Sequence, residues 1–354
     1  AGNVWAMRKL ITIAALLAAT PAHPQASANV AAGRAQPSPL APSEIVNAAP
    51  KDDWMAIPPS DLLVMDLAPD AKDKPRRVVI QLMPAPFSQG WVSNIRKLAA
   101  AKFWDGTSIN RVQDNYVVQW GDANAEDKTK ARKLPGDLAV VPQANYSSRL
   151  GKQEVVYSLQ SAHPLGQDFI TDGAGSKTRW YPIHPSRDAY AEGTAILAGW
   201  PIAVAPRATA TDKELELSGW PVHCYGMVGV GRDMPPNTGT GAELYAVIGH
   251  APRHLDRNIA LVGRVIEGIE HLSSLPRGTG ALGFYETPEE RTAIVSIRIG
   301  SEVSGLPAYE YLSTESESFA RYADAHANRR DAFFIRPAGG ADICNIPVPV
   351  RRAK

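Results

Sequence analysis

Short apolar runs rich in β-branched residues make up most of the hydrophobic pattern of this chain. Runs of about four to eight such residues, bounded by Gly, Pro, Asn or Asp, predict β-strands. Because helices do not alternate regularly with these runs, the pattern favours an antiparallel barrel over a doubly wound sheet. Eight strands are predicted, over residues 62–67, 77–83, 107–113, 116–120, 224–230, 243–249, 259–266 and 292–300.

Helical spacing occurs in a few segments between and after these strands. Trp91, Ile95 and Leu98 recur at intervals of four and three residues, with Ser88 before them as a candidate N-cap. Further helices are expected near residues 268–275 and over roughly 314–328. The chain is therefore predicted to be mostly β.

The first 28 residues have the pattern of a secretory signal peptide. Arg8 and Lys9 give a basic start, residues 10–19 form an apolar run, and Ala26 to Ala28 provide a small-residue cleavage site. The run is shorter than the roughly 20 residues that span a bilayer, so no permanent membrane anchor is expected, although an uncleaved leader would tether the protein. The sequence predicts export, so that the protein is periplasmic or secreted.

The segments around the predicted strands differ in composition. Residues 29–60 are rich in Ala, Pro and Ser without a sustained period, as expected for a linker. Residues 123–222 contain two possible strands, at 137–142 and 154–159, and a segment of this length is expected to fold as a lid or subdomain. The predicted division is 1–28 signal peptide, 29–60 linker, 61–122 and 223–300 barrel, 123–222 insertion and 301–354 C-terminal extension.

Composition narrows the function classes. The chain has 354 residues, of which 44% are hydrophobic, and its 37 basic and 36 acidic residues leave a formal charge of +1. Such a balance gives no global attraction for a polyanion, so no nucleic acid partner is expected. The two cysteines, Cys224 and Cys344, either form a disulfide in an exported protein or remain buried thiols, and both interpretations stay open.

Two strips place a few polar side chains within apolar, β-prone sequence, at residues 109–122 and 241–250. Strips of this kind suit a strand-lined groove that holds an apolar ligand and binds one polar group of it. On the first strip, alternation puts Thr107, Ile109 and Arg111 on one face of a strand.

In order and spacing, the sequence resembles the cyclophilin peptidyl-prolyl isomerases over residues 61–122 and 224–300. Two segments carry most of the resemblance, VVIQLMPAPFSQGWVSNIRKLAAAKFWDGTSINRV at 78–112 and GAELYAVIGHAPRHLDRNIALVGRVIEG at 241–268. The resemblance implies a closed, antiparallel, eight-stranded barrel capped by two helices, here with a large insertion and a C-terminal extension. It also implies isomerisation of X-Pro bonds without a metal or cofactor.

The resemblance implies that Arg111 is the catalytic arginine and Gln119 the groove glutamine. An arginine suits this reaction because its guanidinium is always charged and donates in a fixed fork, so it can bind a twisted amide better than either planar isomer. Gln119 would orient Arg111 or the peptide. Other positions are expected to contact the peptide: Tyr116, Val117, Tyr245 and Leu255 around the proline ring, Val228, Gly229 and Val230 as a backbone rail, and Glu243 and His254 beside them.

The sequence departs from the family pattern at several positions. Asn110 replaces the histidine before the arginine, Ile259 replaces a pocket histidine, and Gly229 stands where the rail has an asparagine. Glu243 replaces a glutamine; it is either a surface charge or a partner of Arg111, and we favour the pair. These changes bear on affinity and turnover more than on the fold.

Two further motifs are assigned to structure rather than to chemistry. Residues 278–283 fit G-x-G-x-x-G but do not lead from a strand into a helix, so a turn is expected. His250, His254 and Asp256 lie close in sequence without a nucleophile motif or zinc-ligand spacing. A hydrolase that uses His254 and Asp256 is therefore a weak alternative, and no metal site is expected.

The sequence thus predicts a monomeric peptidyl-prolyl cis-trans isomerase that acts on X-Pro segments of exported polypeptides. The main alternative is a catalytically weak cyclophilin-like module that binds Pro-containing peptides as a chaperone. Arg111 and Gln119 favour the enzyme, whereas Gly229 and Ile259 favour the binding module.

Overall fold

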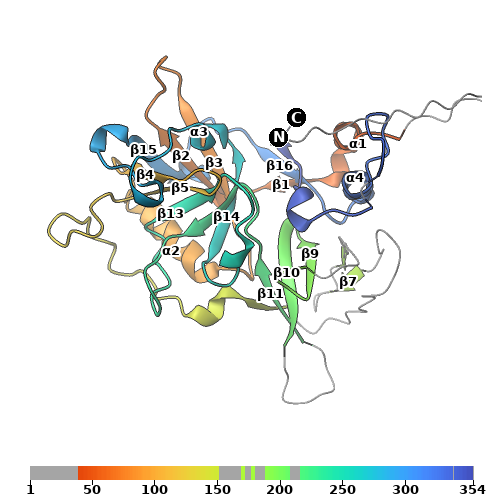
Figure 1. The fold of residues 1–354 in the computed structure, drawn as a ribbon, viewed down its shortest axis with the longest axis horizontal. Coiled ribbons are helices and arrows are strands. Elements are labelled where there is room, and N and C mark those ends of the chain that lie inside the picture. Colours follow the sequence, from red (N-terminus) through yellow and green to blue (C-terminus); the bar gives the residue numbers. More distant parts are fainter. Residues whose placement is uncertain are drawn as a thin grey trace, which may run out of the picture. The chain divides into compact units, whose positions relative to one another are not determined.

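The computed structural model describes residues 39–150, 169–171, 177–179, 188–207, 216–337 and 339–353. The predicted signal peptide, the first part of the predicted linker and the possible strand at 154–159 lie outside these residues. Eight antiparallel strands close into a barrel, most of whose strands are labelled in Figure 1. Around the barrel their order is β12-β13-β5-β4-β15-β2-β3-β14. Their bounds are β2 Leu62–Leu67, β3 Arg76–Leu82, β4 Ser108–Val112, β5 Val117–Gly121, β12 Met227–Val230, β13 Leu244–Val247, β14 Leu261–Glu267 and β15 Thr292–Ile299.

The closed barrel confirms the predicted fold class. Its register brings apolar residues of neighbouring strands together: Leu63 of β2 faces Ile80 of β3, and both are buried. Strand β12 begins at Met227 rather than at the predicted residue 224, because Gly226 has a φ of 79° and turns the chain just before the strand.

Helix α2, Gln89–Ala100, packs against β14 and β15 and buries Trp91 and Leu98, as its helical spacing predicts. Ser88 precedes this helix but makes no capping hydrogen bond, and its φ is 56°. The predicted Ser88 cap is wrong, because a capping residue ordinarily has an extended backbone. A short second helix, α3 (Glu270–Ser273), packs against β3.

The described part of the insertion contains a four-stranded antiparallel sheet in the order β6-β11-β10-β9. The strand predicted at 137–142 is wrong, because side chains from other segments bind this backbone. Asn94 bonds to both the N–H and the C=O of Ala139, and the Thr238 hydroxyl donates to the carbonyl of Val141. The insertion strands are β6 Ser148–Leu150, β9 Gly193–Leu197, β10 Trp200–Arg207 and β11 Glu216–Pro221, with a separate pair of β7 Phe169–Thr171 and β8 Lys177–Arg179.

Residues 39–60 are folded, so the linker prediction is wrong for this part of the chain. Helix α1 contacts α4, and β1 pairs with β16 of the C-terminal extension in a three-stranded sheet, β1-β16-β17. Residues 39–60 are therefore held in a folded structure by a segment far away in the sequence. Local composition does not reveal this contact. The bounds are α1 Pro42–Ala48, β1 Trp54–Ile57, β16 Tyr309–Leu312, α4 Glu317–Ala327 and β17 Val350–Arg352.

The turn between β9 and β10 joins the insertion to two other segments. The carbonyl of Gly199 accepts a hydrogen bond from Arg264 of β14 at 2.7 Å, and its N–H donates to Thr314 of the extension at 3.2 Å. The Arg264 guanidinium also lies 4.4 Å from the ring of Trp200. Arg264 is buried, and its burial lowers the pKa of this residue to about 10.

Cys224, just before β12, forms a disulfide with Cys344 in the extension, with 5.1 Å between the two Cα atoms. The alternative of two buried thiols is therefore excluded.

Within the described ranges, no helix is both long and apolar enough to cross a membrane. Short 3-10 turns complete the fold: η1 Lys51–Asp53, η2 Pro59–Asp61, η3 Gln143–Tyr146, η4 Arg253–Leu255, η5 Ala281–Gly283, η6 Pro288–Glu290, η7 Gly300–Glu302 and η8 Ile343–Asn345.

Candidate active site

Arg111 lies on β4 opposite Gln119 of β5. The pairing shifts by one residue between Ile109 and Arg111, and this β-bulge places Arg111 opposite Gln119 rather than Val118. Ile109 is fully buried, whereas Arg111 is half-buried. The prediction that the two residues share one face is therefore wrong, because simple alternation takes no account of a bulge.

Among the described residues, the guanidinium of Arg111 has three hydrogen-bond partners. Nη1 donates to Oε1 of Gln119 at 3.0 Å, Nη2 donates to Oε1 of Gln113, and Nε donates to the carbonyl of Leu282 at 2.7 Å. Each nitrogen thus has one fixed partner. Charge-assisted bonds of this kind hold the guanidinium plane in one orientation.

Two aromatic rings lie beside the same guanidinium. Its central carbon is 5.2 Å from the ring centre of Phe284 and 5.7 Å from that of Tyr116. Partial burial lowers the pKa of Arg111, while Tyr116 and Glu243 act in the opposite direction. An arginine remains charged at neutral pH under these conditions, because its ordinary pKa is far higher.

Glu243 does not form an ion pair with Arg111. Its carboxylate accepts a hydrogen bond from Nε2 of Gln119, and the other end of that amide binds Arg111. Burial raises the pKa of Glu243, although the hydrogen bond from Gln119 opposes the shift. The favoured direct pair is therefore wrong, and Gln119 links the two charged groups instead.

An apolar cluster separate from the main core lies next to this polar chain. Val117, Tyr245 and Val247 form its buried part, and Tyr116 and Ile259 pack against them while remaining half-buried. The structure thus brings together three of the four residues predicted to hold a proline ring. Val117 and Tyr245 are 3% and 4% exposed, so a ligand would reach the cluster through Tyr116 and Ile259.

Two further predicted contacts, His254 and Leu255, lie on η4. His254 is exposed, and its ring stacks on Tyr116 with 6.4 Å between centres and 7° between planes. Leu255 is half-buried and does not belong to the Tyr116 cluster. His254 thus lies beside Tyr116 at the site, whereas Leu255 is outside the cluster.

The predicted backbone rail is not available for a peptide. Val228, Gly229 and Val230 belong to β12, which pairs with β13 on one edge and β14 on the other. A strand inside a closed barrel has no free edge to which an extended peptide could add. This prediction is therefore wrong. The chain leaves the barrel at Gly231, whose N–H donates to the carbonyl of Glu243 at 2.9 Å.

A buried chain of hydrogen bonds begins at the hydroxyl of Tyr245. This hydroxyl lies 2.8 Å from Nε2 of His223, and Nδ1 of His223 lies 2.8 Å from Asp256. Asp256 accepts from Nε of Arg253 at 2.6 Å, and the Arg253 terminal nitrogens bind Asp188 at 2.9 and 3.0 Å. The chain connects the Tyr116 cluster to the insertion, and sequence reasoning missed it.

Burial fixes the protonation states along this chain. Burial lowers the pKa of His223, which outweighs the opposing effect of Asp256, and burial raises the pKa of Tyr245 well above its ordinary value. The neutral imidazole therefore accepts from the Tyr245 hydroxyl at Nε2 and donates from Nδ1 to Asp256, an assignment made from the network. The one sequence feature that pointed to this buried chain was a polar residue, His223, directly before a predicted strand.

Asp256 is thus bound to His223 and not to His254, so the pair that the hydrolase alternative requires is not formed. Across the described ranges, no group of three or more His, Cys, Asp and Glu side chains is arranged to hold a metal.

The segment predicted as a turn at 278–283 is a turn, and it also reaches the site. Gly278 donates its N–H to the carbonyl of Val112 at 2.9 Å, and Phe284 forms a β-bridge with Arg111. The segment therefore lies along an edge of β4 and sets the Leu282 carbonyl against the guanidinium. Its glycines were the available signal, because they let two backbones approach closely.

A family model described as cyclophilin type peptidyl-prolyl cis-trans isomerase/CLD matches residues 73–299. This span is more than half of the chain, and the chain therefore belongs to the cyclophilin-type peptidyl-prolyl cis-trans isomerases. The enzyme class is that of the family, and the predicted family resemblance is confirmed.

One of two similar solved structures supports the barrel fold. Cyclophilin AquaCyp293 from Hirschia baltica is 21% identical, with a TM-score of 0.57, and the match covers 85% of this chain and 94% of that chain. A cyclophilin-type isomerase from Cryptosporidium parvum, solved in the presence of the dipeptide Ala-Pro, is 10% identical with a TM-score of 0.34 over 67% of this chain and 98% of that chain. No curated protein matches the chain.

Proposed function

We propose that the chain accelerates cis–trans isomerisation of X-Pro bonds in exported polypeptides, and that Arg111 is the catalytic residue. The observation that carries this proposal is the placement of the Arg111 guanidinium, which is held by three hydrogen bonds beside the apolar cluster around Tyr116. Family membership supports the reaction class, and this geometry supports the assignment to the residue.

Arg111 keeps donors for a substrate. A guanidinium carries five N–H groups, and its three partners use one on each nitrogen. One N–H on each terminal nitrogen is left to bond to the prolyl amide as its C–N bond twists. Such bonds withdraw electron density from the C–N bond, whose rotation barrier is about 18–20 kcal/mol. Rotation breaks no covalent bond, so no nucleophile is required.

Gln119 and Glu243 act as positioning residues in this proposal. Because Glu243 accepts from the amide nitrogen of Gln119, the amide oxygen faces Arg111. An amide held at both ends resists flipping, and the guanidinium keeps its direction before the substrate arrives. Preorganised donors of this kind cost no reorganisation when the amide twists.

The catalytically weak binding module is the second candidate. It is favoured by the burial of Val117 and Tyr245, which leaves little of the cluster open, and by the contact of Leu282 and Phe284 with Arg111. A peptide must lie over Tyr116 and displace or bypass this loop before its proline meets the guanidinium.

The proposal places the protein in the periplasm or outside the cell, as a monomer. Support for export comes from the signal-peptide pattern of the first 28 residues and from the Cys224–Cys344 disulfide. Disulfides persist in oxidising compartments and are rare in the cytosol.

The test is a protease-coupled or NMR exchange measurement on an Ala-Pro peptide. Arg111→Ala removes a charge-assisted interaction of about 2–3 kcal/mol from the transition state, so kcat/KM is expected to fall by roughly two orders of magnitude. Arg77→Ala is the matched control, because Arg77 lies on β3 and pairs with Asp66 away from the site. Activity of Arg111→Ala equal to that of the control contradicts the mechanism. Peptide binding without accelerated exchange in the unaltered protein favours the binding module.

A further inference from the structure

A pocket of about 470 Å³ opens at the end of the β4–β5 hairpin. Its wall includes Ser108 at the start of β4, Asp122 just after β5, and Arg291 just before β15. Two more basic side chains, Lys130 and Arg132, come from the insertion. The barrel and the insertion therefore build this pocket together.

The charged groups in the wall favour an anion. Three are basic, Lys130, Arg132 and Arg291, and one is acidic, Asp122. The Asp122 carboxylate is already engaged, because its two oxygens accept the N–H groups of Asn124 at 3.0 Å and Arg132 at 2.7 Å. Its negative charge remains, but the three cations outnumber it, so the wall carries a net positive formal charge.

Two of the basic groups have partners that hold them in place. Arg132 donates to the carbonyl of Asp105 at 2.7 Å, which fixes its guanidinium at one side of the pocket. Lys130 lies 3.3 Å from Asp127, an exposed pair that solvent weakens. Asp127 offsets part of the Lys130 charge, whereas the contact with a neutral carbonyl leaves the charge of Arg132 in place.

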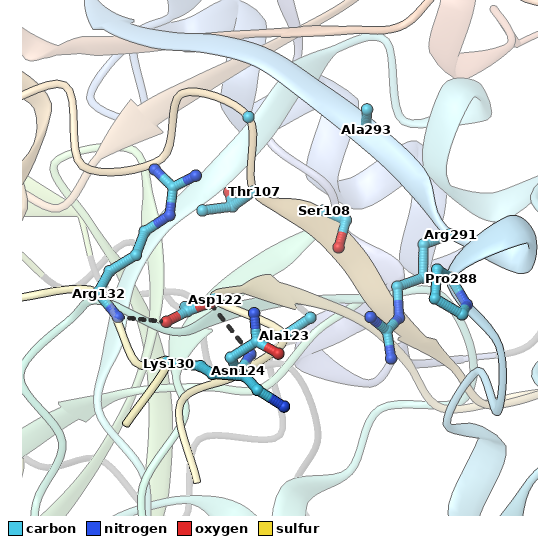
Figure 2. Close-up of a pocket in the computed structure, with 11 residues that line it drawn as sticks. Thr107, Ser108, Asp122, Ala123, Asn124, Lys130, Arg132, Pro288, Arg291 and Ala293 are labelled. Atoms are coloured by element: carbon cyan, nitrogen blue, oxygen red, sulfur yellow. Dashed lines mark hydrogen bonds between the residues drawn. The ribbon is translucent and has the colours of Figure 1, made fainter. Parts of the chain in front are cut away.

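Arg291 is the basic residue of the wall with an unsatisfied side-chain donor. Its Nε is buried and unbonded within the part of the chain that the structure describes. The neighbouring acid, Glu290, is committed to the Thr279 hydroxyl at 2.6 Å and the Thr287 N–H at 2.9 Å. Figure 2 shows Arg291 on one side of the pocket and Lys130, Asn124 and Asp122 on the other. Because this Nε is sealed from solvent, an oxyanion in the pocket would bind to the terminal nitrogens of Arg291.

The pocket lies on the same hairpin as the proposed catalytic residue. Ser108 precedes Arg111 by three positions on β4, which corresponds to about 10 Å along a strand. A polypeptide with its proline at Arg111 therefore needs a few extended residues to reach Arg291.

We propose that this pocket is a subsite for an oxyanion, a carboxylate or phosphate group, on a side chain of the polypeptide whose proline occupies the Arg111 site. The inference rests on the proposed function, because it uses the same polypeptide. It assigns the enzyme a preference for clients with an acidic or phosphorylated residue close to the proline.

The test is a binding titration with Ala-Pro peptides that carry Glu, Gln or phosphoserine at successive positions on either side of the proline. The unaltered protein is expected to bind the best Glu or phosphoserine peptide about tenfold more tightly than its Gln counterpart, and to lose this preference at high salt. Arg291→Gln is expected to remove the preference and leave binding of the Gln peptide unchanged. Lys72→Gln, in the exposed turn between β2 and β3, is the matched control.

Equal binding of Glu, phosphoserine and Gln peptides to the unaltered protein at every position overturns the proposal. Titration with inorganic phosphate separates the two sources of the anion. If phosphate binds in a manner that requires Arg291 while the peptides do not differ, the pocket takes a free oxyanion and the assignment to the polypeptide is wrong. Failure of the proposed function is distinguishable, because it appears as unaccelerated exchange of the neutral peptide, whereas these titrations measure binding.

Discussion

Replacing His223 with Phe removes the centre of the buried chain between Tyr245 and Asp256. Phe keeps a planar ring but offers no nitrogen to either neighbour. In the unaltered protein both ring nitrogens are bonded at 2.8 Å, and the histidine side chain is fully buried. The substitution therefore tests how much the chain contributes to stability.

The expected loss follows from the groups left behind. The Tyr245 hydroxyl would remain at a position 4% exposed without an acceptor, which costs about 1–3 kcal/mol. Asp256 would lose one charge-assisted bond, about 1.5–3 kcal/mol, but would keep Arg253 at 2.6 Å and the backbone N–H of residue 223 at 3.0 Å. We expect the free energy of unfolding to fall by about 3–5 kcal/mol in total.

The assay is equilibrium unfolding in urea with the disulfide intact. His250→Phe is the control, since His250 is exposed and its side chain lies outside the buried chain. Tyr245→Phe alone should cost less than His223→Phe, and the double variant should cost less than the sum, because the stranded hydroxyl is gone. A difference of less than about 1 kcal/mol between His223→Phe and His250→Phe would refute this reasoning.

Three further outcomes are expected. Burial lowers the pKa of folded His223 below the unfolded value of about 6.5, so the unfolded state binds the proton more readily. The free energy of unfolding should therefore decline as the pH falls below about 6.5, and it should decline less in His223→Phe. Urea unfolding at several pH values measures both effects. Phe284→Ala removes the ring 5.2 Å from the guanidinium and should lower kcat/KM severalfold in the exchange assay, from a cation–π contact of about 0.5–1 kcal/mol. Gly199→Ala puts a Cβ 2.7 Å from the Tyr311 ring at a φ of 84°; its melting temperature should drop more than that of Gly305→Ala, where φ is 69° and nothing lies within 4 Å.

The barrel was predictable because each strand carries its own local pattern. Strand β2 occupies the predicted residues 62–67, and β3 begins one residue before the predicted 77–83. The partnership of Arg111 and Gln119 was also within reach, since the two residues lie on adjacent predicted strands. Local periodicity carries this information because the alternation of buried and exposed positions is a property of the strand itself.

The rest of the site depends on contacts that local pattern does not contain. Asp188 and Arg253 meet although 65 residues separate them, and no spacing rule links them. The bulge beside Arg111 changes the register by one residue, which alternation cannot express. The prediction that the backbone at Gly229 pairs with a peptide was wrong for a related reason. A resemblance aligns positions along the chain, but it does not say which strand edge is free.

A chain cut after residue 300 would keep all eight barrel strands but lose Thr314 and Cys344. The β9–β10 turn would then keep its two contacts with Arg264 and lose its hydrogen bond to Thr314. Because the N-terminal strand β1 pairs with β16, it too would be left with an unpaired edge. Cutting the chain after residue 300 should therefore produce a fragment that aggregates through its unpaired strand.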